Sequence, residues 1–157
     1  PKLNKLFNRE DSSLKFVVNT YEGVSGLKQM LWNELKTKGE LLGFGSGTIE
    51  DLTGSKIWSE KHRVKTVDAN YKIREINNRS KKPIKFTKNV DFYTNFERRY
   101  ISEDVLNIEQ QTIIYNDTVA TYHWRDDQKV GVEIINKAYA NTMRQIFESY
   151  WRIAEQI

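Results

Sequence analysis

The last third of the chain, residues 107–157, constrains the fold most, because three short strand-like segments and a long helix follow one another there. Residues 110–115 and 118–124 are rich in β-branched and aromatic residues, and Asn116-Asp117 separates them as a tight turn. A third strand is expected at residues 129–135, after a polar turn. These segments predict an antiparallel meander.

The final helix is expected to begin near Asn136 and to back this meander. Its apolar residues recur at three- and four-residue spacing, which places them on one helical face. They are Tyr139, Met143, Ile146, Phe147, Tyr150 and Ala154.

The first half of the chain alternates strand-like and helical segments. Strands are expected at residues 14–18, 40–44, 71–76 and 98–102. Helical segments are expected at residues 22–38 and 91–96. A further helical region is expected after Thr48, and its apolar positions are Leu52, Ile57, Trp58 and Val64. Alternation of this kind favours parallel βα units. The whole chain therefore predicts an α/β fold, a mixed sheet with helices on its faces and a C-terminal antiparallel meander plus long helix.

The length of 157 residues corresponds to one domain, and 38% hydrophobic residues suffice for a core. The chain contains no Cys, which excludes disulfides and thiolate metal sites and favours a reducing, cytoplasmic location. No apolar run is long enough to span a bilayer, so no membrane contact is expected. Residues 1–13 are polar and predict a connector from an upstream segment, and residues 14–157 the domain itself.

The formal net charge of +4 permits contact with nucleic acid or other anions without requiring it. Basic residues cluster at Lys61–Lys65 and between Arg79 and Lys88. Each cluster is either a solvated surface or a docking patch for DNA or an anionic ligand. Aromatic residues are not interleaved with these basic residues in the sequence, which argues against single-strand binding by base stacking.

A glycine-rich segment, Gly43-Phe44-Gly45-Ser46-Gly47, joins a predicted strand to a predicted helix. Glycines allow close approach of a ligand to the backbone, and a helix N-terminus favours anions. The spacing matches neither the dinucleotide-binding fingerprint nor the phosphate-binding P-loop. The segment is therefore either a tight turn or a pocket wall at the carboxyl end of a strand.

Two histidines and one arginine are further candidates. We expect His62 on an exposed basic helix face and His123 beside Trp124 near the end of a strand. No cluster at metal-ligand spacing accompanies either histidine, so no metal or other cofactor is expected. Arg74, beside Glu75, makes either a strand-edge ion pair or a polar clamp for hydroxyls or a carboxylate.

The hairpin resembles the local layout in which phospholipase D-like domains present a His-x-Lys-(x)4-Asp active site. Alignment on the turn puts Glu109, Gln111 and Asn116 at the three motif positions, and a shift of one residue does not restore the motif. These residues supply neither the nucleophilic histidine nor the phosphate-neutralising lysine. The absence points away from an enzyme, although Glu109 and Gln111 share one strand face and could bind a polar ligand.

Five segments in order resemble the effector-sensing, phospholipase D-like domain of TrmB-type transcriptional regulators. They are Thr20–Gly23, Ser59–Val64, Thr112–Ala120, Val130–Ile134 and Phe147–Trp151. The resemblance implies a non-catalytic ligand-sensing and dimerisation domain. It also implies that DNA is contacted only through a helix-turn-helix domain outside this chain.

This hypothesis predicts a homodimer that binds a small-molecule effector, such as a sugar or another polar metabolite. The ligand would lie at the carboxyl ends of the strands, near Gly43, Gly45, Ser46, Arg74, Glu109, Gln111, His123 and Trp124. Two alternatives stay open, a ligand-free protein-interaction and dimerisation domain and a diverged phosphodiester hydrolase.

Overall fold

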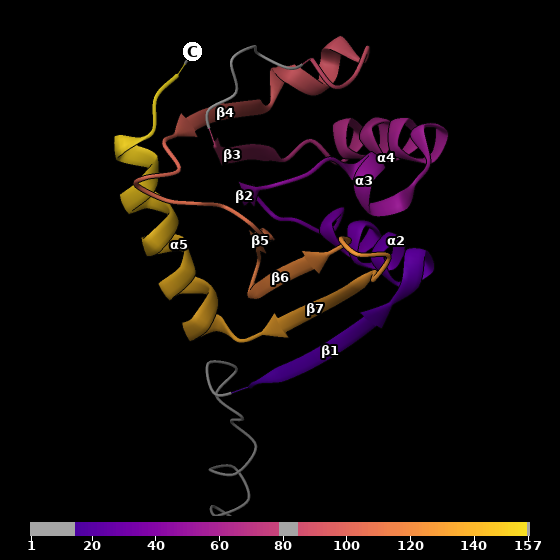
Figure 1. Cartoon of the computed structure of the whole chain (residues 1–157), viewed down its shortest axis with the longest axis horizontal. Helices are drawn as coiled ribbons and strands as arrows, with labels where there is room; N and C mark the ends of the chain where they lie inside the picture. Colours follow the sequence, from indigo (N-terminus) through magenta and orange to yellow (C-terminus); the bar gives the residue numbers. More distant parts are fainter. Residues whose placement is uncertain (1–14, 79–84, 157) are drawn as a thin grey trace, which may run out of the picture.

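The structure is a computed structural model that describes residues 15–78 and 85–156. Its strands form one sheet in the order β1-β7-β6-β5-β2-β3-β4 (Figure 1). The strands are β1 (Val17–Glu22), β2 (Glu40–Gly45), β3 (Lys72–Asn78), β4 (Phe96–Ile101), β5 (Gln111–Tyr115), β6 (Thr118–His123) and β7 (Val130–Ile135). The helices are α2 (Gly23–Glu34), α3 (Ile49–Thr53), α4 (Lys56–Ala69), the 3-10 helix η2 (Val90–Thr94) and α5 (Lys137–Ile153). The predicted mixed α/β fold is confirmed. The expected connector at residues 1–13 lies outside the described residues.

The sheet has a parallel half and an antiparallel half. β2, β3 and β4 are parallel, whereas β5, β6 and β7 form the predicted antiparallel meander. The expectation for the first strand was wrong, because β1 pairs antiparallel with β7 and starts no parallel unit with β2. β1 occupies the free edge of the meander. This pairing depends on the residues of β7, which are more than a hundred positions away in the sequence.

The helices cover the two faces of the sheet unequally. Figure 1 shows α5 alone on one face and α2, α3 and α4 on the other. Alternate side chains of each strand therefore enter different core clusters. Under α5, Phe147 is buried, as the helical spacing predicted, and it stacks on Trp151, which was not among the predicted apolar positions and is also buried, with ring centroids 5.6 Å apart. Ile146 departs from that stripe and is 41% exposed.

The helical region after the glycine-rich segment is two helices and not one. Thr48 caps α3 in a reciprocal capping box with Asp51. Gly54, with φ of 65°, ends α3 in the left-handed conformation that glycine adopts without steric cost. Ser55 then caps α4 by accepting a hydrogen bond from the backbone N–H of Trp58.

The predicted turn at Asn116-Asp117 joins β5 to β6, and Asn116 has a left-handed φ of 48°. Its side chain accepts a hydrogen bond from the backbone N–H of Lys38 and donates one to the carbonyl of Lys36. The hairpin tip is therefore tied to the loop between α2 and β2.

Among the described helices, none has the length and apolar character needed to cross a bilayer.

Candidate functional site

The glycine-rich segment lies in the centre of the sheet, where β2 is flanked by β3 and β5. A Cβ atom on Gly45 would lie 2.2 Å from Oδ1 of Asn77 and 2.7 Å from the carboxyl carbon of Glu75. Gly43 is tight as well, since its Cβ would lie 3.1 Å from Cδ1 of Ile113. Neighbouring side chains therefore already occupy the space that these two glycines leave.

Gln111 closes the turn after β2. Its Oε1 accepts hydrogen bonds from the backbone N–H groups of Ser46, at 2.8 Å, and Gly47, at 3.4 Å. The indole ring of Trp124 covers Gly47 so closely that a Cβ there would lie 2.5 Å from Cζ2. Four of the predicted ligand residues, Gly45, Ser46, Gln111 and Trp124, are thus gathered at the carboxyl end of β2.

Arg74 is separated from this group by the sheet. Consecutive residues of a strand point to opposite faces, so Arg74 lies under α5 and Glu75 under α4. The guanidinium of Arg74 binds both carboxylate oxygens of Glu40, at 2.5 and 2.9 Å, and also pairs with Glu148 of α5. These hydrogen bonds raise the pKa of Arg74. Of the two alternatives for Arg74, the ion pair forms, with Glu40 and Glu148 as partners in place of Glu75, and Arg74 ties β3 to α5.

Glu109 and His123 do not join the group either. Glu109 is exposed ahead of β5 and borders a shallow groove beside Phe44 and Tyr150. His123 ends β6, and its Nδ1 lies 3.3 Å from Nε2 of Gln110. Ligand contact by these two residues stays a prediction.

A cavity of about 90 Å³ adjoins the Gln111 turn on the face covered by α2, α3 and α4. Its polar lining includes Glu34, His62, Arg63, Glu75, Arg98 and Gln111. Phe86, Phe92 and Phe96 pack against one another on one side, with ring centroids 5.4 to 5.7 Å apart. A few convergent polar groups in a largely apolar wall are typical of small-molecule sites. We call this space the α4 cavity.

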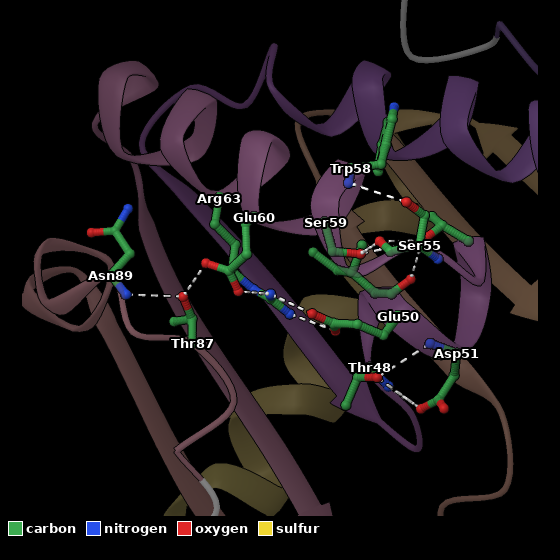
Figure 2. A network of polar contacts seen from close by, with 12 residues as sticks. Thr48, Glu50, Asp51, Ser55, Trp58, Ser59, Glu60, Arg63, Thr87 and Asn89 are labelled. Carbon is green, nitrogen blue, oxygen red and sulfur yellow. Dashed lines mark hydrogen bonds and ion pairs between the residues drawn. The ribbon is translucent and has the colours of Figure 1, made fainter.

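Arg63 is the central charged group of the α4 cavity and is only 1% exposed. Its guanidinium binds both carboxylate oxygens of Glu50, at 2.6 and 2.7 Å, and one of Glu60, at 2.7 Å. Figure 2 shows this network, in which Glu60 also accepts a hydrogen bond from Thr87, ahead of η2. The Nε atom of Arg63 has no hydrogen-bond partner among the described residues.

His62 is buried, at 3% exposure, so its expected place on an exposed helix face was wrong. Its Nε2 lies 2.7 Å from the carbonyl oxygen of Leu31 in α2. Because a carbonyl only accepts, Nε2 carries the proton, and Nδ1 of the neutral ring is an acceptor. No described residue pairs with Nδ1. Burial lowers the pKa of His62, and the charge of Arg63 acts in the same direction, so the neutral ring is favoured.

The opposite wall of the α4 cavity carries a second ion pair. Arg98 donates to Glu75 through Nε at 2.9 Å, and its Nη2 lies 2.7 Å from the same oxygen. The guanidinium also lies 5.0 Å from the ring centroid of Phe86 and 5.2 Å from that of Phe96. Burial raises the pKa of Glu75, and the charge of Arg98 opposes that rise.

The sequence pattern did not reveal His62, Arg63, Glu34 or Arg98 as cavity residues. α4 has polar or charged residues around its whole circumference, so its periodicity does not show which face is buried. Two of the apolar positions named for this helical region, Ile57 and Val64, are 75% and 49% exposed. The sequence contains one feature that is recognised as unusual only once the structure is known. Arg63 has acidic partners on two helices, Glu50 on α3 and Glu60 on α4.

The described residues include no group of three or more His, Asp or Glu side chains placed to hold a metal ion.

Solved structures of similar fold span most of the chain. One is TrmBL2, an archaeal chromatin protein described as showing a novel mode of DNA binding, with TM-score 0.63, 17% identity and 99% of this chain covered. NucT from Helicobacter pylori has TM-score 0.67 and 10% identity, and covers 91% of this chain and 100% of its own. Nuc from Salmonella typhimurium, a phospholipase D family member, has TM-score 0.61 and 10% identity, with 91% and 99% covered.

The fold is phospholipase D-like. This chain spans 59% of the length of TrmBL2. No protein-family model and no curated protein sequence matches it. At these identities the likeness establishes the fold alone.

Proposed function

We propose that this chain is a non-catalytic ligand-sensing and dimerisation domain of a cytoplasmic transcriptional regulator, and that its effector binds in the α4 cavity. The likeness to TrmBL2 over 99% of the chain supports the regulatory context. The observation that carries the proposal is that two residues lining this cavity, His62 and Arg63, each keep a buried polar atom, Nδ1 and Nε, with no hydrogen-bond partner among the described residues.

These two atoms select a class of ligand. Nδ1 of His62 accepts a hydrogen bond and Nε–H of Arg63 donates one. A hydroxyl group suits both, because it can donate to the first and accept from the second. Leaving a buried donor or acceptor unpaired costs about 1–3 kcal/mol, which a ligand that pairs with it recovers. Sugars and other hydroxyl-bearing metabolites meet this requirement.

The size of the α4 cavity implies movement on binding. A cavity of about 150 Å³ holds a molecule as large as benzene, whereas this one measures about 90 Å³. A sugar would therefore displace α3 and α4 from the sheet. A ligand shifts an equilibrium only by its differential affinity for two states, and here those states would be the closed and the opened cavity.

The positions of the phospholipase D-like motif support the non-catalytic part of the proposal. Gln111 uses its side-chain oxygen to hold the turn after β2. Asn116 uses its amide to hold the loop after α2. Neither side chain is a nucleophile or a phosphate-neutralising cation.

The test is a thermal-unfolding screen of the whole chain against sugars, polyols, sugar phosphates, nucleotides and amino acids. A specific ligand at a hundredfold excess over its dissociation constant stabilises the fold by about 2.7 kcal/mol. The variant Ile73→Phe narrows the α4 cavity and should abolish a saturable shift, whereas Ile134→Phe, on β7, should keep it. A shift that survives Ile73→Phe would place the ligand elsewhere.

The dimer is tested separately by light scattering coupled to size exclusion. A stable dimer with no thermal shift across the panel would favour the ligand-free assembly domain. A monomer that binds a ligand would remove dimerisation from the proposal and keep sensing.

A diverged phosphodiester hydrolase is the second candidate, favoured by the fold of Nuc, a phospholipase D family member. His123 is the histidine at the end of the hairpin. Hydrolysis of a chromogenic phosphodiester that is lost in His123→Ala would establish this candidate and refute the non-catalytic one.

A further inference from the structure

The outer surface of α2 and α4 displays two tryptophans side by side. The ring centroids of Trp32 and Trp58 are 6.3 Å apart, and the planes are tilted by 48°. Trp32 is 46% exposed, which is unusual for so large an apolar side chain. A groove of about 310 Å³ runs past them and is lined by Trp32, Trp58, Lys61, His62, Val64 and Lys65. We call it the tryptophan groove.

The ring surfaces of the tryptophan groove are held in place from below. His62 stacks on Trp58 with the ring centroids 5.3 Å apart and the planes 18° from parallel. His62 is itself fixed by its hydrogen bond to the carbonyl of Leu31. The exposed ring of Trp32 therefore lies on a rigid support, so a ligand that stacks on it would pay little ordering entropy.

The tryptophan groove is positively charged. Lys61 and Lys65 line it, and Nζ of Lys28 lies 5.4 Å from the ring centroid of Trp58. None of these three lysines has a carboxylate partner within residues 15–78 and 85–156, whereas Arg63 and Arg98 are paired. Among the described residues, three lysines without a carboxylate partner thus lie beside the tryptophan pair, and they favour a ligand that is both flat and anionic.

We infer that the tryptophan groove binds single-stranded nucleic acid. A base stacks on Trp32, and Lys28, Lys61 and Lys65 contact the adjoining phosphates. Stacking on aromatic side chains beside a basic groove is how proteins bind single strands without reading their sequence. This site shares only His62 with the lining of the α4 cavity and adds a nucleic-acid contact within the chain itself. The sequence pattern did not reveal this groove, because Trp32 and Lys61 are 29 positions apart in the chain.

Two other occupants fit the tryptophan groove less well. A second copy of the chain in a two-fold dimer would bring the same surface against itself, and so three lysines against three lysines. An extended peptide binds through main-chain hydrogen bonds, but the backbones of α2 and α4 use theirs within each helix. An acidic helical peptide is the remaining competitor, and the experiment includes it.

The experiment titrates the whole chain into a fluorescein-labelled thymidine 15-mer and follows fluorescence anisotropy at several salt concentrations, with tryptophan fluorescence as a second readout. Binding should quench tryptophan fluorescence and weaken with salt. Each phosphate contact contributes about 0.7 to the slope of log affinity against log salt for a single strand. Lys61→Ala combined with Lys65→Ala should lower that slope by about 1.4, and Trp32→Ala should weaken binding about tenfold.

Lys137→Ala removes an exposed lysine at the start of α5 and is the matched control, which should leave affinity unchanged. Thermal unfolding verifies that each variant folds, and the lysine double variant tests the site even if Trp32→Ala does not fold. Absence of binding at low salt, or equal affinity of the double variant and the wild type, overturns the inference. Equal affinity for a duplex overturns the stacking part. Full competition by an acidic helical peptide, with no tryptophan quenching by DNA, assigns the groove to a protein partner instead.

Discussion

The hydroxyl of Tyr122 on β6 donates a hydrogen bond to the carboxyl group of Glu34 on α2, and both side chains are buried between helix and sheet. Burial raises the pKa of Glu34 to about 8, against the opposing effect of the Tyr122 hydrogen bond. The negative charge of Glu133, which accepts hydrogen bonds from Tyr21 and Asn33, adds to the rise. Glu34 is therefore mainly protonated in the folded protein at pH 7 and ionised in the unfolded chain.

The pair predicts a loss of stability at alkaline pH. The folded-state pKa of Glu34 lies above the unfolded value of 4.5, so its contribution is fully present below about pH 4.5 and is lost as the pH rises to about 8. The free energy of unfolding should fall by roughly 4 kcal/mol over this range from Glu34 alone. In Glu34→Gln, which stays neutral, this fall should be absent in urea unfolding at pH 5 and pH 9. The exposed control Glu109→Gln should behave as the wild type, and an unchanged pH dependence in Glu34→Gln would contradict the assignment.

Arg63 should be intolerant of replacement by lysine. Lysine keeps the charge but cannot bind both oxygens of Glu50 while it reaches Glu60, because it lacks the planar fork of the guanidinium. Disruption of a buried pair costs about 3 kcal/mol, and Arg63→Lys should lose about that much in the free energy of unfolding. Arg125→Lys, at an exposed position, is the control. A loss below about 1 kcal/mol in Arg63→Lys would mean that the network contributes little.

Arg74 should matter for stability and not for effector binding. Its ion pairs with Glu40 and Glu148 join β3 to α5, on the side of the sheet away from the α4 cavity. Because these groups are partly exposed, we expect Arg74→Ala to cost only about 1 kcal/mol. The ligand-induced thermal shift should keep its size and midpoint. Loss of the thermal shift in Arg74→Ala, with little change in stability without ligand, would instead show that Arg74 belongs to the ligand site.

Gly47 and Gly43 should differ in their tolerance of alanine. A Cβ on Gly47 would lie 2.5 Å from the rigid ring of Trp124, whereas on Gly43 it would lie 3.1 Å from the flexible end of Ile113. Overpacking costs about 1–3 kcal/mol, so Gly47→Ala should lie at the upper end of that range and Gly43→Ala at the lower end. Trp124 fluorescence should also change in Gly47→Ala alone. Equal losses in the two variants would show that Trp124 moves aside freely.

Much of the architecture could be predicted because its signals are local. The hairpin at Asn116-Asp117 follows from strand-forming runs on both sides of a two-residue turn. Asn136, at which the last helix was expected to begin, caps α5 by accepting a hydrogen bond from the backbone N–H of Tyr139. Gly54, which interrupts the helical pattern, marks the boundary between α3 and α4.

The candidate site could be predicted only in part. The strand end at Ser46 and the start of β5 at Gln111 were recognised from the sequence, and the structure joins them by a hydrogen bond. Arg74 was assigned to the same site because it was expected near the carboxyl end of a strand, where the ligand was predicted to bind. Its side chain lies on the other face, since register on β3 decides which of two neighbouring residues faces α4.

The sequence by itself determined the kind and order of the elements, because strand alternation, helical spacing and caps depend on residues within a few positions of one another. Only the tertiary structure decided which polar side chains are buried and which aromatic side chains meet. His62 and Arg63 are enclosed because Leu31 of α2 and Glu50 of α3 offer them partners. Such contacts join residues far apart in the chain. When a helix is polar on every side, its own sequence does not show which of its residues make them.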